Sequence, residues 1–414
     1  MSGKGRTAML VIHGIGQQNP FETLDSFTQG LLPAASILFN CKYDLFHRQV
    51  GRKGMSDWES WQQYYVAMDS RTGPQIDVYE HYWAYRMTGK ATLADISDWL
   101  KGASRFAREY YNPAKGGPNL RERARQNKDS PLNRMLEPGS DRLHSNCYLH
   151  LLGYAVPVML PLMAFVEDVL PANRFIKWLY KSVSGRLKAV VIDYVGDVAV
   201  YTQTDRKAKL FPVRQQMLTD ARMAIEALLM DKRYDQVIVL GHSLGSVVAY
   251  DALNRLHKAP PVLAGDGCDE ESYRRLRGLV TFGSPLDKTF FFFQADVKDD
   301  QILREQILVH LHSFKQKLSH SVRGAERLPL ADETSGNLPD VTWINFFDCN
   351  DPISGHLDAF DVDNQALTMG AKFGAAHVEY WKHPAMYDKI LRTFFKTAVA
   401  LDPALSPKRR AAGG

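Results

Sequence analysis

The sequence predicts an α/β protein in which a mostly parallel central sheet is flanked by helices. Residues 8–12 and 237–240 are unbroken apolar runs with β-branched side chains, which is typical of strands buried on both faces. Apolar residues at helical spacing follow each run, at 21–39 and 246–256. A strand followed by a helix, twice over, indicates βα units and therefore a parallel sheet.

The rest of the chain continues this pattern on both sides of a long interruption. The turn sequence Ser-Arg-Thr-Gly-Pro at 70–74 joins two early strands, and the core resumes at 189–201. We predict further strands at 64–68, 76–85, 279–283 and 341–347, and further helices at 214–230 and 302–322.

The composition is that of an ordinary globular protein. Of the 414 residues, 45% are apolar and 23% are charged, and the net charge of +5 is too small to suggest binding to nucleic acid. The cysteines are too widely spaced for a metal-binding pair or a secreted disulfide framework, which indicates a reducing compartment. Residues 1–7 lack a signal-peptide pattern, so we expect a cytoplasmic protein.

The alternation of strand and helix stops between residues 89 and 188. Within this region, 143–166 has no Asp, Glu, Lys or Arg and is long enough to cross a bilayer, but its prolines favour a kinked structure. A buried cap helix, a membrane-inserted hairpin and a full span all remain open. We expect a core formed by 1–88 and 189–402, an inserted and mainly helical cap at 89–188, and a flexible basic tail at 403–414.

Residues 172–188 carry five basic side chains and no acidic one. Such a basic amphipathic helix suits an anionic lipid surface at the inner face of a membrane, although docking on the core explains it equally well. We expect co-sedimentation with phosphatidylglycerol or phosphatidylserine vesicles that weakens as salt screens the charges. The combined change Arg174→Glu, Lys177→Glu and Lys181→Glu should reduce this binding. A protein that stays in the supernatant at low salt would instead favour a soluble cap.

Ser243 lies in the sequence Gly-His-Ser-Leu-Gly, between a predicted strand and a predicted helix. This arrangement matches the Gly-x-Ser-x-Gly elbow, in which a sharp turn lifts a nucleophilic serine above the edge of the sheet. Gly241 and Gly245 suit such an elbow because side chains there would collide with the neighbouring strand and helix. The alternative is an ordinary turn in which the serine caps the helix.

A second glycine-rich turn, His13-Gly-Ile-Gly16, follows the first predicted strand. In a serine hydrolase, a turn in this place offers a backbone N–H to the oxyanion of the tetrahedral intermediate. We therefore expect the amides of Ile15 and Leu244 to form the oxyanion hole. The turn is weakly diagnostic alone and becomes more specific when it is combined with Ser243.

A serine nucleophile also needs a base and a carboxylate that orients the base. Asp348 and Asp351 both follow the predicted strand at 341–347, and we favour Asp351 because it lies in a turn from which it can reach a loop histidine. Asp348 is then expected to stabilise a turn.

For the base we favour His377, which follows a loop of small residues at 370–376. His383 and His356 are the alternatives. His242, beside the nucleophile, is expected to point away from the site and to be structural. We expect no metal and no cofactor, because the sequence contains no cluster with metal-ligand spacing.

The segments 241–251 and 11–16 together resemble lipase-like α/β-hydrolases. They look most similar to intracellular phospholipases of the DDHD type and to bacterial relatives with an inserted, sometimes membrane-associated cap. The sequences Asn-Asp-Pro-Ile at 350–353 and His-Val-Glu-Tyr-Trp at 377–381 also resemble the acid and base loops of lipases. The resemblance extends over the core, at 7–20, 190–290 and 340–385.

This resemblance implies an α/β-hydrolase fold and hydrolysis of a carboxylic ester through an acyl-enzyme on Ser243, with a lipid ester as the expected substrate. A soluble esterase or thioesterase acting on a small acyl substrate is a second interpretation. A non-catalytic scaffold on the same fold is a third, and the presence of serine, acid and histidine candidates together argues against it.

Overall fold

The computed structural model covers the core segments of the chain. It describes residues 5–14, 19–50, 64–86, 211–258, 268–286, 303, 307, 312–316, 336–348, 351, 354–357, 360–369 and 375–395. The expected cap at 89–188, with the stretches 143–166 and 172–188, lies outside these residues, as do the segment 189–201 and the tail at 403–414. Within the described ranges, no helix is both long and apolar enough to cross a bilayer.

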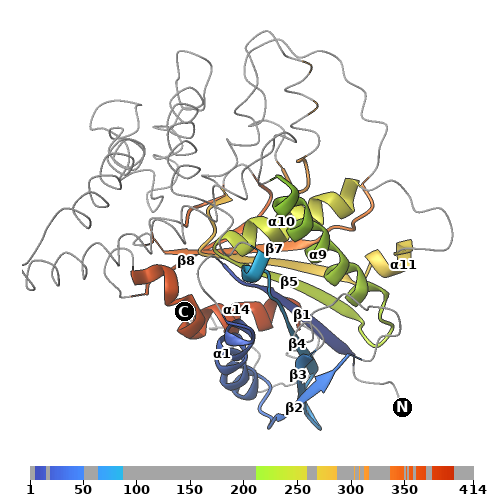
Figure 1. The fold of residues 1–414 in the computed structure, drawn as a ribbon. Coiled ribbons are helices and arrows are strands. Elements are labelled where there is room, and N and C mark those ends of the chain that lie inside the picture. Colours follow the sequence, from blue (N-terminus) through green and yellow to red (C-terminus); the bar gives the residue numbers. More distant parts are fainter. Residues whose placement is uncertain are drawn as a thin grey trace, which may run out of the picture.

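One eight-stranded sheet runs through the described part of the chain (Figure 1). Its spatial order is β2-β3-β4-β1-β5-β6-β7-β8, parallel from β4 to β8 and antiparallel at β2 and β3. The strands are β1 (Arg6–Ile12), β2 (Asp44–Gln49), β3 (Tyr64–Asp69), β4 (Gln75–His81), β5 (Gln236–His242), β6 (Leu276–Phe282), β7 (Thr342–Asp348) and β8 (Asp363–Leu367). The predicted α/β class with a mostly parallel sheet is confirmed.

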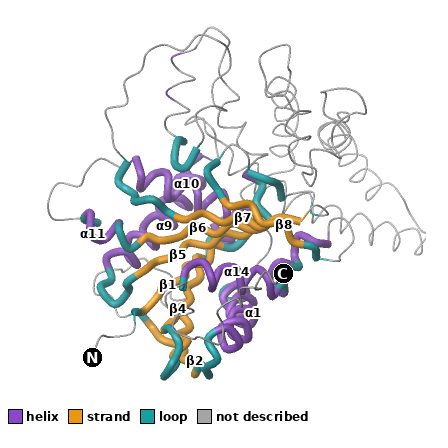
Figure 2. The backbone as a smooth tube through the Cα atoms, turned by 180° about the vertical axis from the view of Figure 1, so that it is seen from behind, coloured by secondary structure: helices purple, strands orange, loops and turns teal. Residues whose placement is uncertain are grey.

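Helices cover both faces of this sheet (Figures 1 and 2). One face carries α1 (Glu22–Leu38) and α14 (Pro384–Phe394), which pack against each other, and the other carries α9 (Phe211–Met230) and α10 (Leu244–Lys258). Shorter elements are α11 (Glu270–Tyr273) and the 3₁₀ helices η2 (Ala84–Arg86), η9 (Ala375–Val378) and η10 (Tyr380–Lys382). Because successive side chains of a strand alternate, Leu10 and Val239 join the core under α9 and α10, whereas Met9 and Ile238 join the core under α1.

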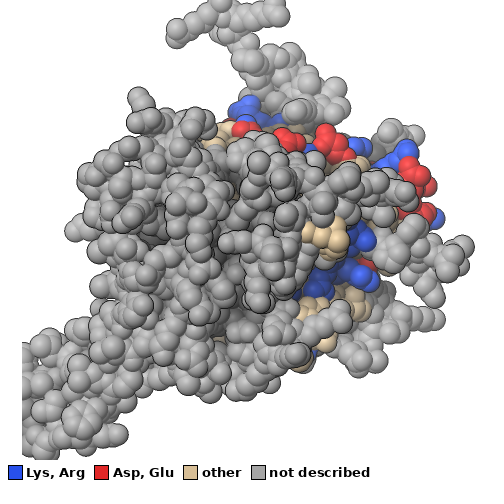
Figure 3. All heavy atoms as spheres, turned by 90° about the horizontal axis from the view of Figure 1, so that it is seen from above, with Lys and Arg blue, Asp and Glu red and all other residues tan. Residues whose placement is uncertain are grey.

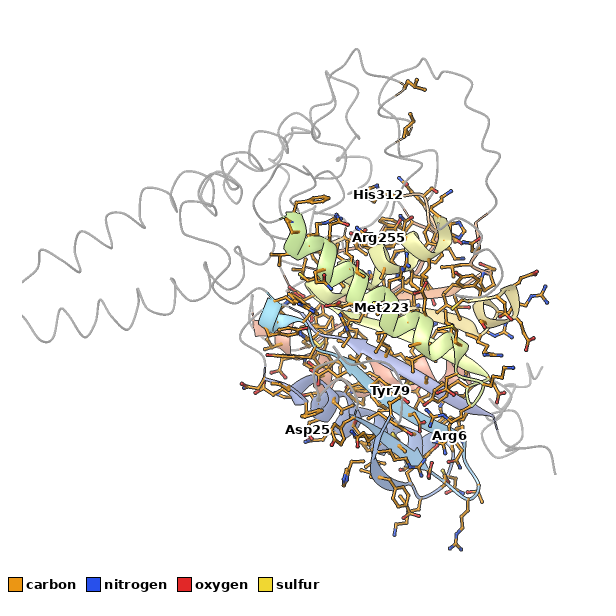
Figure 4. All side chains as sticks on the ribbon, turned by 45° about the vertical axis from the view of Figure 1, so that its right-hand side comes forward. Arg6, Asp25, Tyr79, Met223, Arg255 and His312 are labelled. Atoms are coloured by element: carbon orange, nitrogen blue, oxygen red, sulfur yellow. The ribbon has the colours of Figure 1, made fainter. Side chains whose placement is uncertain are left out.

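A buried polar network ties the strands together at the amino end of the sheet. Asp77 of β4 pairs with Arg6 of β1 and accepts a hydrogen bond of 2.8 Å from the hydroxyl of Tyr234, just before β5. That hydroxyl also bonds to the hydroxyl of Tyr79, and Figure 4 shows Tyr79 and Arg6 in the same part of the molecule. These bonds compensate for the cost of burying polar groups. The opposite, carboxyl end of the sheet carries the candidate site.

The structure adds two strands to the prediction and shortens two elements. The edge strands β2 and β8 were not predicted because their side chains are mostly exposed or half-buried and show no apolar alternation. The strand predicted at 76–85 ends at His81, and a 3₁₀ turn follows. The helix predicted at 302–322 was wrong at its end, because Gln316 forms a β-bridge with Phe360.

Candidate active site

Ser243 lies in a sharp turn between β5, which ends at His242, and α10, which begins at Leu244. Its φ angle of 52° falls in the left-handed region, which residues other than glycine rarely adopt and which costs about 1–3 kcal/mol. Hydrogen bonds hold the turn: the Ser243 amide donates to the Phe282 carbonyl over 3.0 Å, and the Ser243 carbonyl accepts from the amide of Ser246 over 3.0 Å. The Ser246 hydroxyl donates to the same carbonyl over 2.5 Å.

Glycines let three backbone segments approach one another around Ser243. A Cβ added at Gly241 would lie 2.5 Å from the Ser246 Cα, and one at Gly245 would lie 2.2 Å from the His13 carbonyl oxygen. A Cβ at Gly14 would lie 2.6 Å from the Cβ of Ser243. Strand β1, strand β5 and helix α10 can therefore meet at Ser243 only with glycine at these positions.

We expect Gly245→Ala to destabilise the protein by about 1–3 kcal/mol, because the new methyl group meets backbone atoms that cannot move alone. Gly5→Ala is the matched control: its added Cβ would meet the end of the Asp235 side chain, which can rotate away. Urea unfolding of both variants measures the effect. Equal midpoints for the two variants would contradict this account of the turn.

Ser243, His377 and Asp351 form one hydrogen-bonded series. The His377 Nε2 lies 2.9 Å from the Ser243 Oγ, and the His377 Nδ1 lies 2.8 Å from the Asp351 Oδ2. Since a carboxylate can only accept, the Nδ1 carries the proton and the Nε2 is left as an acceptor for the serine hydroxyl. Ser243 follows β5, Asp351 follows β7 and His377 follows β8. These strands are parallel, so their carboxyl ends meet at one edge of the sheet.

The alternative candidates take other places. The Asp348 Oδ2 accepts a hydrogen bond of 2.6 Å from the Met369 amide, so this carboxylate holds the segment that leaves β8. His356 packs its ring against Phe347, and His383 occupies the N-cap position of α14. None of the three takes part in the hydrogen bonds to Ser243 or His377 given above.

His242 supports the main chain of the candidate base. Its Nε2 lies 3.0 Å from the His377 carbonyl oxygen, so this nitrogen carries the proton and donates it. The two imidazole rings lie 5.0 Å apart, centre to centre. Burial lowers the pKa of His242 to about 3, so the ring is neutral at physiological pH. The expectation that His242 points away from the site was wrong, because its ring packs beside His377.

Of the two expected oxyanion donors, Leu244 is among the described residues and Ile15 is not. Leu244 is the first residue of α10 and is buried, and an amide in the first turn has no acceptor inside its own helix. The N-terminus of α10 also favours negative charge. Ile15 lies outside the described residues, but Gly14 just before it lies against Ser243.

His13 fixes the start of that glycine-rich turn. Its Nε2 accepts a hydrogen bond of 2.9 Å from the amide of Trp83, and the Trp83 indole N–H donates to the His13 carbonyl over 3.0 Å. Burial lowers the pKa of His13 to about 3, which leaves the ring neutral and able to accept. This role could not be predicted from the sequence, because Trp83 is distant from His13 along the chain.

No group of three or more His, Cys, Asp or Glu in the described ranges is arranged to hold a metal ion. Acidic and basic side chains of described residues lie interspersed on the face shown in Figure 3.

No protein-family model matches the chain, and neither a curated protein nor a solved structure shows significant similarity to it.

Proposed function

We propose that this chain is a serine hydrolase of the α/β-hydrolase fold that cleaves a carboxylic ester through an acyl-enzyme on Ser243. The observation that carries this proposal is the pair of hydrogen bonds, 2.9 Å and 2.8 Å, that join Ser243 to His377 and His377 to Asp351. The left-handed turn at Ser243 supports it as well. The order of serine, acid and histidine along the chain is the order found in α/β-hydrolases.

In the first half of the reaction, the Ser243 Oγ attacks the ester carbonyl carbon while its proton moves to the His377 Nε2. Asp351 stabilises the resulting imidazolium and keeps its Nδ1 proton directed away from the serine. The negative charge on the former carbonyl oxygen is stabilised by the Leu244 amide and, as we infer, by the Ile15 amide. The tetrahedral intermediate collapses, and the alcohol leaves with the proton held on His377.

In the second half, water attacks the acyl-enzyme while His377 accepts one of its protons. The collapse of this second intermediate returns the proton to the Ser243 oxygen and releases the carboxylic acid. Every proton transfer uses the same nitrogen, which explains why the tautomer set by Asp351 matters in both halves.

We propose a lipid ester as the substrate. The resemblance of 241–251 and 11–16 to lipase-like enzymes and DDHD-type phospholipases supports this choice. Val378, which follows His377 in the chain, is an apolar residue that is 59% exposed. A small soluble acyl ester or thioester remains the second candidate, because the same three side chains would cleave it by the same steps.

Labelling with a fluorophosphonate probe tests the proposal directly. The probe phosphonylates an activated serine, so we expect stoichiometric modification that peptide mapping places on Ser243. Hydrolysis of a series of p-nitrophenyl esters and phospholipids would then distinguish a lipase-like enzyme from a small-ester hydrolase. A folded protein that neither reacts with the probe nor hydrolyses any of these esters would support the scaffold interpretation.

A further inference from the structure

A buried tyrosine lies directly behind the acidic member of the series. Tyr380 is fully buried, and its hydroxyl lies 3.1 Å from the Asp351 Oδ2, the same oxygen that lies 2.8 Å from the His377 Nδ1. The Tyr380 hydroxyl also accepts a hydrogen bond of 2.9 Å from the Asp348 amide and lies 3.0 Å from the Ser354 Oγ. Asp351 and Ser354 are fully buried as well.

The direction of these hydrogen bonds follows from the groups involved. A phenol has one proton to donate, and a carboxylate can only accept, so the Tyr380 proton goes to Asp351. The Asp348 amide can only donate, which leaves the second lone pair of the phenol for the Ser354 hydroxyl. Burial raises the pKa of Tyr380 well above its usual value, so the phenol keeps the proton that it donates.

We propose that Tyr380 is a positioning residue that fixes the Asp351 carboxylate and keeps it ionised, so that His377 stays in the tautomer that can accept the serine proton. This inference rests on the proposed function, because it assigns a role within the same site. A carboxylate removed from water needs donors to remain charged, and Asp351 receives two of them on one oxygen. The donors approach from different elements, η9 and η10, so together they restrict its rotation.

A packing role alone would not require the hydroxyl. The Tyr380 ring already contacts the rings of His242 and Phe282, at centroid distances of 6.1 Å and 6.1 Å, and phenylalanine would preserve both contacts. Tyr387 provides a matched comparison: it is also a buried tyrosine, but its hydroxyl donates to the Trp381 carbonyl over 2.8 Å and not to the series. Tyr380→Phe and Tyr387→Phe each remove one buried hydroxyl, and the proposal predicts different consequences.

We expect Tyr380→Phe to lower kcat for a soluble p-nitrophenyl ester by about 10- to 100-fold with little change in KM. The loss of a hydrogen bond to a charged group changes a rate by about this factor. The acidic limb of the kcat/KM profile should move to higher pH, because less of the enzyme keeps an ionised Asp351 and a neutral His377 at a given pH. Tyr387→Phe should alter neither quantity. If Tyr380→Phe and Tyr387→Phe had the same kcat and the same pH for the acidic limb of the kcat/KM profile, the proposal would be overturned.

Two further measurements keep the proposal testable if Tyr380→Phe does not fold. Substitution of Tyr380 by 3-fluorotyrosine keeps the ring and makes the hydroxyl a stronger donor, so the acidic limb should move to lower pH; an unchanged limb would refute the assignment. The proton NMR signal of the His377 Nδ1–H should also shift in the 3-fluorotyrosine variant and stay unchanged in Tyr387→Phe. This NMR measurement requires no substrate. A fully active Ser243→Ala variant would reject the proposed function itself. Activity that requires Ser243 but is unchanged by the substitutions of Tyr380 would reject only the role of Tyr380.

Discussion

Ser243→Ala should lower kcat for p-nitrophenyl ester hydrolysis by about 10⁴-fold or more while the protein stays folded. The change removes the Oγ that lies 2.9 Å from the His377 Nε2, so no acyl-enzyme can form. Alanine does not add bulk, and the bonds of the turn to Phe282 and Ser246 use the main chain, which stays. Stopped-assay rates and fluorophosphonate labelling measure the loss, and near-ultraviolet circular dichroism checks the fold.

Ser26→Ala, in helix α1, is a suitable control for this experiment because it removes a serine hydroxyl far from the elbow in sequence. We expect it to retain normal turnover. If a clean preparation of Ser243→Ala were as active as Ser26→Ala, Ser243 would not be the nucleophile and the proposed mechanism would fail.

Asp351→Asn should reduce kcat by about 10⁴-fold, although the side chain keeps its size. In the unmodified protein, the Asp351 carboxylate accepts a hydrogen bond of 2.8 Å from the His377 Nδ1. An asparagine can offer its NH₂ group to that nitrogen, which moves the imidazole proton to the Nε2 and leaves no lone pair facing Ser243. Steady-state rates of p-nitrophenyl ester hydrolysis measure this loss, which should be large because every proton transfer depends on the same tautomer.

Asp348→Asn is the matched control, since this carboxylate lies close in sequence and bonds to the Met369 amide. The amide oxygen of asparagine can still accept that bond, so we expect less than about a 10-fold loss of kcat. A greater loss in Asp348→Asn than in Asp351→Asn would show that the acid has been assigned to the wrong residue.

The local parts of the site could be predicted from the sequence. The elbow depends on residues 241–245, where two glycines flank the serine and an apolar strand precedes it. The crowded backbone of the turn requires these glycines, so the turn that exposes the serine can be recognised from the sequence motif. The acid and base lie on separate loops, and the structure places the favoured candidates, Asp351 and His377, next to each other.

The parts that were missed depend on contacts between distant segments. Tyr380 follows His377 closely, but the sequence does not indicate that its hydroxyl reaches Asp351 and the Asp348 amide. The direction of the His242 ring depends on the path of η9, and the role of His13 depends on Trp83. The edge strands β2 and β8 lack periodic apolar residues because their side chains are mostly exposed or half-buried on both faces.

The spacing of the series along the chain has a consequence for folding. Ser243 and His377 are 134 positions apart, and their approach depends on β6, β7 and β8 being added in register beside β5. Bringing such distant segments together costs loop-closure entropy before any contact compensates for it, so non-local parallel pairing is slow. During refolding from denaturant, helical signal should therefore return first and esterase activity last. The recovery of esterase activity during refolding would then report when the sheet is complete.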